Sequence, residues 1–308
     1  MRIAAFILSD VRSGSTLLDQ CLGAHDDVVT LGEAHWLAAY VTHDRSLYDP
    51  VHELVCACGQ DVGDCPFWNG VRRELGNPLE SLDLHSRFTR PPRDGSVVSR
   101  IRFLPRRLVR SYPRLYRHPA IRRVLGASRL ARDSLSLLEA ASKASGCGIC
   151  IDSSKSPFRF RAIHGLDSGR TRAIVLARDF RAVVHSKMTR GESLESAARG
   201  WRVAMEQIAD LTQDMSGDQV HCLRYESLCE QPRRELERLC GFLGIRFQET
   251  MLRRPGPGHL HHIGGSPSKF DESRSEIVLD RSYERAFPAS DVNRMRRIVG
   301  DEAVRWSY

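Results

Sequence analysis

The feature that most constrains the fold is an apolar segment at the start of the chain, followed by a turn of small residues and a helical pattern. Residues 3–8 (IAAFIL) have the length and composition of a buried strand, and residues 17–22 continue with helical spacing. The turn between them contains RSGST at residues 12–16. Because the first amide groups of a helix have no internal partner and the helix dipole adds positive charge there, this order predicts an anion site.

The turn differs from the GxxxxGK[ST] loop that binds nucleoside triphosphates. When Gly14 is aligned with the second glycine of that motif, Ser9 takes the first glycine position and Ser15 takes the lysine position. Such a loop can hold a phosphate but lacks the lysine that reaches a transferred phosphate. The same residues would also serve as a simple helix cap, so this stretch alone leaves both interpretations open.

Strands and helices alternate along much of the remaining chain. We expect strands at residues 28–31, 149–151, 172–177 and 220–224, and helices around 135–141 and at 180–189, 193–214 and 235–243. This alternation indicates an α/β, P-loop-like, three-layer fold with a mostly parallel central sheet flanked by helices. Ligands of such sheets lie beyond the carboxyl ends of the strands, where the polar clusters of this chain also fall.

The composition fits one large domain. A chain of 308 residues that is 41% hydrophobic can bury a sizeable core, so we expect a single domain over 1–308 with a basic, helical or irregular insertion at about 40–145. Lys plus Arg exceed Asp plus Glu by eight (46 against 38), which favours anionic ligands.

The opening apolar run is too short for a signal peptide or a transmembrane segment, so we expect a cytoplasmic protein.

A cysteine cluster in the insertion leaves its chemistry open. Cys56, Cys58 and Cys65 lie close together, but nine cysteines scattered over the chain do not form a disulfide framework. Three thiolates could hold zinc with a fourth ligand from His52 or elsewhere, or two of them could form a disulfide. No second CxxC pair accompanies them, so no metal ligand is assigned. Three later histidines, His259, His261 and His262, stand in a Gly/Pro-rich loop, where solvent-facing or acceptor-lining positions are more typical than metal binding.

The insertion also contains an arginine-rich stretch at residues 100–123, in which leucines and tyrosines are interleaved. This pattern predicts one or more basic surface helices. They would form either a solvated helical face or a lid that guides an acidic acceptor.

Several segments resemble sulfotransferases that use 3′-phosphoadenosine 5′-phosphosulfate (PAPS). Residues 12–16 resemble the 5′-phosphosulfate loop, and IVLARDFRAVVHSKMTRG is similar to the 3′-phosphate motif, with Arg178 and Ser186 at the matching positions. LGEAHWL resembles the glutamate-bearing segment of the carbohydrate and tyrosyl-protein branches. LRYESLCEQPRRELERLCGFLGI resembles the strand and helix that follow the donor site. The resemblance covers residues 3 to about 285 and suggests a soluble, bacterial-type member.

The resemblance implies a sulfotransferase that moves the sulfuryl group of PAPS to an acceptor hydroxyl. The donor-binding residues that it implies are Arg12, Ser13, Gly14, Ser15, Thr16, Arg178, Ser186, Tyr225, Gly265, Ser266, Ser268 and Lys269. Lys269 stands where the carbohydrate-type pattern often has arginine, so the charge is kept and the fork geometry is lost. Two alternatives stay open: Arg178 could pair with Asp179, and Tyr225 could be an ordinary buried tyrosine.

The catalytic residues that the resemblance implies are Glu33, Lys155 and Arg12. Glu33 is the expected general base, with a pKa raised by burial, and Lys155 is expected to stabilise the bridging oxygen. Asp152 is expected to hold the loop in which Lys155 lies. Glu33 could instead be exposed or paired with an arginine, and Lys155 could be a surface lysine.

His35 and Trp36 are expected to contact the acceptor, although a packed His35 fits equally well. PAPS is the expected co-substrate, and no metal is required, because PAPS has no triphosphate for magnesium to chelate. The alternatives are a small-molecule kinase and a non-catalytic nucleotide-binding module.

The acceptor class stays open among glycans, peptide tyrosines, lipids and small metabolites. The basic insertion leans mildly toward an anionic acceptor, and no nucleic-acid partner is expected. The sequence does not indicate the oligomeric state.

Overall fold

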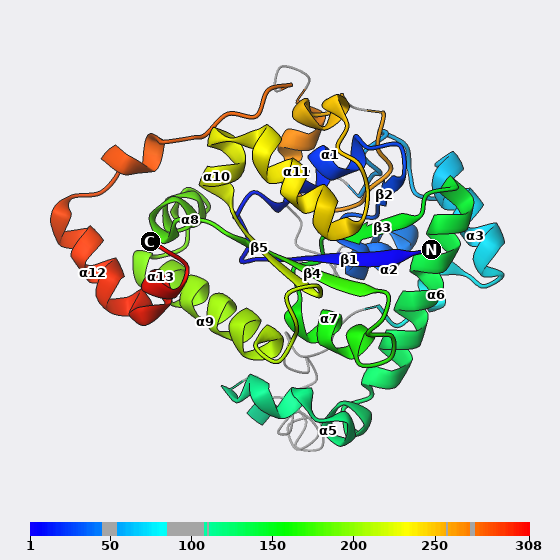
Figure 1. Cartoon of the computed structure of the whole chain (residues 1–308), viewed down its shortest axis with the longest axis horizontal. Coiled ribbons are helices and arrows are strands. Elements are labelled where there is room, and N and C mark those ends of the chain that lie inside the picture. Colours follow the sequence, from blue (N-terminus) through cyan, green and yellow to red (C-terminus); the bar gives the residue numbers. More distant parts are fainter. Residues whose placement is uncertain (45–53, 85–107, 110, 257, 272–274) are drawn as a thin grey trace.

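A parallel sheet forms the centre of the protein (Figure 1). The computed structural model describes residues 1–308 except 45–53, 85–107, 110, 257 and 272–274. Its strands are β1 (Ile3–Leu8), β2 (Val28–Thr30), β3 (Ile149–Asp152), β4 (Thr171–Ala177) and β5 (Val220–Arg224). They lie in the order β2-β3-β1-β4-β5, and each neighbouring pair is parallel. The apolar opening segment is therefore the central strand, which needs apolar side chains on both faces.

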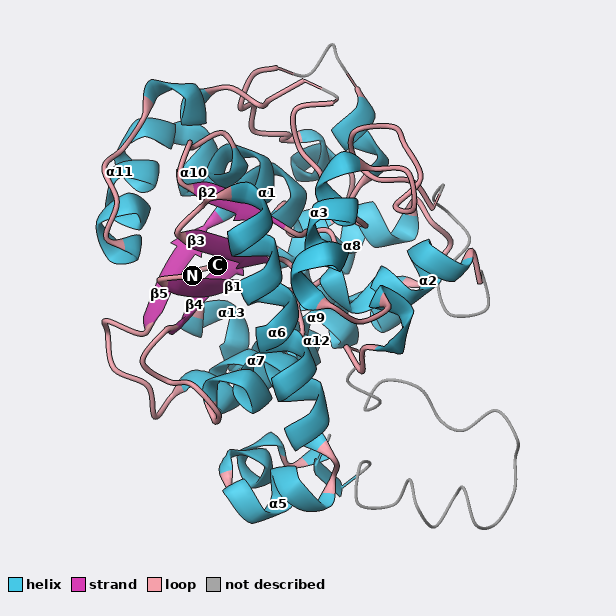
Figure 2. Cartoon of the chain, turned by 90° about the vertical axis from the view of Figure 1, so that its right-hand side faces the viewer, coloured by secondary structure: helices cyan, strands magenta, loops and turns pink. Residues whose placement is uncertain are grey.

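Helices cover both faces of the sheet (Figures 1 and 2). One face packs against α1 (Ser15–Gly23), α10 (Tyr225–Glu230) and α11 (Pro232–Leu243). The core of the other face includes residues of α2 (Leu37–Thr42), α3 (Pro66–Leu75), α6 (Ala127–Ser145), α7 (Pro157–His164), α8 (Phe180–Met188), α9 (Leu194–Thr212), α12 (Ala289–Val299) and α13 (Asp301–Arg305). The short α5 (Pro119–Val124) lies at the end of α6 that is remote from the sheet (Figure 2).

The side chains of β1 alternate between two hydrophobic layers. Ala4, Phe6 and Leu8 belong to the buried cluster beneath α6 and α9, whereas Ala5 and Ile7 belong to the cluster beneath α1 and α11. This alternation follows from the two-residue period of a strand. The two layers fix the rotation of β1, and with it the direction in which the following loop leaves the sheet.

The predicted α/β fold with a central parallel sheet is confirmed. The expected strands at 28–31, 149–151, 172–177 and 220–224 correspond to β2 through β5, and the expected helices correspond to α6, α8, α9 and α11. No individual helix was predicted in the first part of the insertion, but it contains α3, in which Trp68 and Val71 are completely buried. Pro66 is at the start of α3, where its missing N–H leaves no helical hydrogen bond unmade.

The division into a domain and an insertion at 40–145 remains a prediction, and α6 at its end contributes to the main core against β3. Much of the basic stretch 100–123 lies outside the described residues, so a lid there also stays a prediction. Among the helices that the structure describes, none is long and apolar enough to span a bilayer.

Candidate active site

The loop after β1 presents the start of α1 to a cavity. Gly14 precedes α1 with a positive φ of 87°, and no side chain caps the helix. A Cβ at this position would overlap the ring of Tyr225, so the loop needs glycine for its conformation and for its close packing. The first amide groups of α1 are thereby free to face an anion, as the opening motif predicts.

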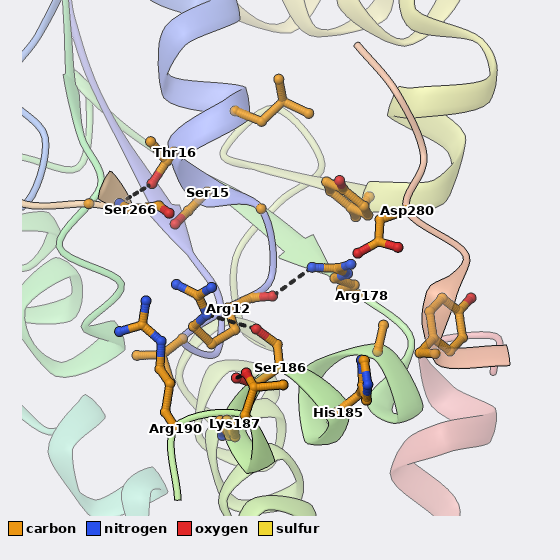
Figure 3. A pocket seen from close by; sticks show the side chains of 18 of the residues that line it. Arg12, Ser15, Thr16, Arg178, His185, Ser186, Lys187, Arg190, Ser266 and Asp280 are labelled. Carbon is orange, nitrogen blue, oxygen red and sulfur yellow. Dashed lines mark hydrogen bonds between the residues drawn. The ribbon is translucent and has the colours of Figure 1, made fainter. Parts of the chain in front are cut away.

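The two segments expected to bind phosphate groups meet at this loop (Figure 3). The Nε atom of Arg12 donates a hydrogen bond to the Ser186 hydroxyl in α8 at 2.9 Å. Arg178, at the end of β4, donates from Nη1 to the carbonyl oxygen of Arg12 at 3.0 Å, and its guanidinium lies 4.4 Å from the ring centre of Tyr225. The alternative expected for Arg178 was a pair with Asp179. In the structure, the Asp179 carboxylate instead accepts hydrogen bonds from the guanidinium group of Arg181.

Positive charge accumulates around Arg12. Burial lowers the pKa of Arg12, and the like charges of Arg190 and Arg178 lower it further. The Nε atom of Arg178 is buried with no hydrogen-bond partner among the described residues. A bound anion would offset the repulsion among these guanidinium groups and the cost of their burial, so the residues present fit a phosphorylated ligand.

Glu33 and Lys155 form a partly buried ion pair beside the same loop. Glu33 follows β2 and Lys155 follows β3, and the ammonium group of Lys155 donates a hydrogen bond to Oε1 of Glu33. Oε2 accepts from the indole N–H of Trp36 at 3.1 Å, and Oε1 also accepts from the backbone N–H of Gly265 at 3.1 Å. Glu33 is therefore neither exposed nor paired with an arginine, which were the two alternatives.

The expected rise in the pKa of Glu33 is wrong. Burial does push this pKa upward, but the charge of Lys155 and the hydrogen bonds from Lys155, Trp36 and Gly265 outweigh it and hold the pKa below the ordinary value of 4.5. Glu33 is consequently a carboxylate at neutral pH.

Residues 259–269, called here the late segment, lie against Glu33. The backbone of this segment runs beside residues 31–33: Ile263 donates to the Leu31 carbonyl at 3.1 Å and accepts from the Glu33 N–H at 2.8 Å. Ser266 donates its N–H to the Thr16 hydroxyl at 2.9 Å, which ties the segment to α1 (Figure 3). The segment therefore connects the loop after β1 to the carboxylate after β2.

One cavity of about 1210 Å³ brings most of the predicted residues together. Those that line it are Arg12, Gly14, Ser15, Thr16, Glu33, Trp36, Lys155, Arg178, Ser186, Tyr225, Gly265 and Ser266. Most of them follow the carboxyl ends of β1 to β5, while Ser186 lies on α8 and Gly265 and Ser266 belong to the late segment, so the site lies at the carboxyl edge of the sheet.

Other predicted residues lie outside the cavity lining. The Ser13 side chain is completely buried, and His35 packs its ring against Trp36 with a centroid distance of 4.4 Å. Lys269 is buried and donates to the Gly264 carbonyl at 2.8 Å, so its charge supports the late segment and does not enter the cavity. The side chain of Ser268 lies outside the described part of the structure. Asp152 holds its loop as expected, accepting from the Ser154 N–H at 2.9 Å.

Several cavity residues were not singled out from the sequence. Lys187 and Arg190 belong to the segment that contains Ser186, and their charges were a usable signal. Lys187 is buried, and its ammonium group donates to Asp10 at 2.6 Å, which fixes α8 against the loop after β1. Arg254 reaches the cavity from a region without periodic pattern, so nothing in the sequence marked it.

A sequence model described as the sulfotransferase family matches residues 4–249, which is most of the chain and includes both anion-binding segments and Glu33. The chain belongs to the sulfotransferase family. It is accordingly a transferase. Two solved structures are similar to this sulfotransferase along almost its whole length, each at 19% identity. One is the sulfotransferase domain from the curacin biosynthetic pathway, with a TM-score of 0.55, covering 100% of this chain and 98% of that one. The other is the sulfotransferase domain from the Synechococcus PCC 7002 olefin synthase, with a TM-score of 0.58, covering 99% and 94%.

At this level of identity, the two structures support the fold of the sulfotransferase. They agree with the parallel sheet and its flanking helices, whereas the roles of individual residues have to be argued from the geometry of the cavity.

Proposed function

We propose that this sulfotransferase moves the sulfuryl group of PAPS to a hydroxyl group of its acceptor. The observation that carries the proposal is the meeting of the α1 N-terminus, the Arg12–Ser186–Arg178 cluster and the Glu33–Lys155 pair in one cavity. PAPS has a 5′-phosphosulfate and a separate 3′-phosphate, so it requires two neighbouring anion sites. A ligand with a single phosphate would leave one of them without a partner.

We assign the two ends of PAPS to the two anion sites. The amide groups of α1 and the hydroxyls of Ser15 and Thr16 would hold the 5′-phosphosulfate, and Arg178 with Ser186 would hold the 3′-phosphate. Arg12 lies between them, since it hydrogen-bonds Ser186 and belongs to the first loop. Tyr225, stacked on Arg178, offers a surface on the adenine side.

Glu33 and Lys155 would act together on the reacting oxygens. As the acceptor oxygen forms its bond to sulfur, its proton passes to the Glu33 carboxylate, and the bond from sulfur to the donor's bridging oxygen breaks. The ammonium group of Lys155 would stabilise the negative charge that develops on that bridging oxygen. Lys155 donates to Glu33 in the structure, so it would leave this partner, and the carboxylate would become a stronger base when the acceptor binds.

The acceptor is proposed to be a hydroxyl compound that reaches Glu33 beside Trp36. Arg190 and Arg254 line the same cavity, and the chain has a net charge of +8, which favours an acceptor with an anionic group.

The experiment incubates the enzyme with PAPS labelled at sulfur and one member of each acceptor class, in buffer that contains EDTA. We expect label in at least one acceptor, together with release of adenosine 3′,5′-bisphosphate. Parallel reactions with labelled ATP and magnesium test the kinase alternative. Label from ATP without label from PAPS would overturn the proposal, and so would binding of adenosine 3′,5′-bisphosphate with no transfer to any acceptor.

A further inference from the structure

Three cysteines and a histidine converge outside the cavity lining. Cys56 and Cys58 lie in a turn, Cys65 immediately precedes α3, and His261 belongs to the late segment. One ligand atom from each lies within 4.8 Å of all the others. The expected partner for the cysteines was His52 or an unspecified residue; His52 lies outside the described part of the chain, and His261 is the residue found beside them.

The separations match those of ligands around one tetrahedral metal ion. The Sγ atom of Cys65 lies 3.7 Å from that of Cys58 and 3.8 Å from that of Cys56. Thiolates bound to Zn²⁺ at about 2.3 Å in tetrahedral geometry are separated by about 3.8 Å. Cys65 is also 3.3 Å from Nδ1 of His261, close to the roughly 3.5 Å expected for a sulfur and a nitrogen ligand. All nine cysteines are free thiols, so no disulfide accounts for the cluster.

The backbone around the four residues is held in place independently of any ion. The Cys56 N–H donates to the Gln60 carbonyl at 2.9 Å, and the Gly59 N–H donates to the Cys56 carbonyl at 2.9 Å, which closes the turn. Trp68 donates its indole N–H to the His261 carbonyl at 2.8 Å, and the Phe67 ring stacks on the His261 ring at 5.5 Å. A site whose ligands are already in position loses little entropy when the ion binds.

We propose that Cys56, Cys58, Cys65 and His261 bind one structural Zn²⁺ ion. Soft thiolate ligands with one imidazole favour zinc over magnesium or calcium. Four protein ligands complete a tetrahedral shell, so the ion has no open position for a substrate, and none of the four residues lines the cavity. The zinc site is thus separate from the cavity in which we propose sulfuryl transfer.

The ion would fasten the late segment to α3. The Ala57 N–H already donates to the His262 carbonyl at 3.0 Å, and Ile263 and Gly265 follow at once with their hydrogen bonds to residues 31–33. The long loop between α11 and α12 contains no long helix or strand among its described residues. A metal crosslink between positions that are 196 residues apart would limit the motion of this loop.

The test measures zinc in enzyme purified without a histidine tag and without added metal, by inductively coupled plasma mass spectrometry. We expect about one zinc per chain in the wild type. Cys58→Ser and His261→Ala should each lose most of it. The matched controls are Cys222→Ser, an exposed cysteine on β5, and His259→Ala, an exposed histidine of the same segment; both should keep the wild-type content.

A second measurement needs no variant that could fail to fold. Titrating wild-type thiols with a mercurial should release the zinc in step with the loss of three thiols, as read by a zinc-sensitive dye. The cobalt-substituted enzyme should show thiolate-to-cobalt charge-transfer absorption. Folded wild-type enzyme without zinc, a mass lower by two hydrogens that reveals a disulfide, or equal zinc in all variants would each overturn the proposal.

Discussion

Gly264→Ala offers a sharp test of how the late segment positions Glu33. Gly264 has a φ of +67°, and a Cβ there would lie 2.7 Å from Cβ of Glu33 and 3.1 Å from its Cγ. Alanine in this left-handed conformation costs about 1–2 kcal/mol at any site. The contact adds a second effect, because ordinary carbon contacts begin near 3.4 Å and Glu33 must therefore move by about 0.7 Å (3.4 minus 2.7).

A control separates the two effects. Gly126 has a φ of +75° before α6, and a Cβ there would meet nothing within 4 Å. Gly126→Ala should therefore show the conformational cost alone, as a loss of about 1–2 kcal/mol in the free energy of unfolding with unchanged kcat. Gly264→Ala should lose more stability than this control.

The catalytic effect of Gly264→Ala follows from the displaced carboxylate. A shift of this size lengthens the 3.1 Å hydrogen bonds that Trp36 and Gly265 donate to Glu33. Because misplacement by about 1 Å costs up to 10²-fold in rate, we expect kcat to fall by about 10- to 100-fold, or about 1.4–2.7 kcal/mol in the barrier. The assay compares labelled-sulfate transfer and urea denaturation for the wild type and both variants. Wild-type kcat in Gly264→Ala, or an equal loss in Gly126→Ala, would refute the reasoning.

Three further predictions concern the charged groups. Glu33→Gln should lower kcat by about 10²–10⁴-fold at neutral pH in the transfer assay; a change below about threefold would exclude the general-base role. In the free enzyme the pKa of Glu33 lies below its ordinary value of 4.5, so the wild-type kcat/KM should be flat from neutral pH to about pH 5 and fall only below that, whereas a fall of kcat/KM between pH 6 and 7 would contradict the assignment. Arg159→Met should lower the free energy of unfolding by about 3–5 kcal/mol in urea titrations, because it leaves buried Asp152, now bound at 2.8 Å, without its cation. Arg233→Met breaks an exposed pair with Glu249 and should cost far less; equal losses in the two variants would contradict this view.

Strands β1, β3 and β4 could be predicted because they are buried on both faces of the sheet and read as short apolar runs. Helix α3 could not be predicted, because only Trp68 and Val71 of its ten residues are buried and the flanking sequence has no periodic hydrophobic pattern. The same pattern located the polar clusters at the carboxyl edge of the sheet, since polar residues that follow an apolar run mark that edge. The individual residues Glu33, Lys155 and Arg178 were singled out by the resemblance to sulfotransferases.

The side-chain pairs across the site could not be predicted from the sequence. Glu33 and Lys155 were each singled out, yet their ion pair depends on β2 and β3 being neighbours, because the two residues are 122 positions apart in the sequence. This separation explains why the pKa of Glu33 was predicted wrongly. Burial of Glu33 was expected from the sequence, but the ammonium group of Lys155 beside it was not. His261 as a neighbour of Cys65 was hidden in the same way by sequence separation.

The central claim, that two anion sites bind opposite ends of one nucleotide, is tested most directly by a binding cycle. Calorimetry gives the affinities of wild type and Arg178→Ala for adenosine 3′,5′-bisphosphate and for adenosine 5′-monophosphate. The account predicts that the 3′-phosphate strengthens binding to the wild type by at least about tenfold, or 1.4 kcal/mol, and that Arg178→Ala loses most of this gain while binding the monophosphate nearly as before. An equal gain from the 3′-phosphate in both proteins, or no binding of the bisphosphate by the wild type, would contradict it.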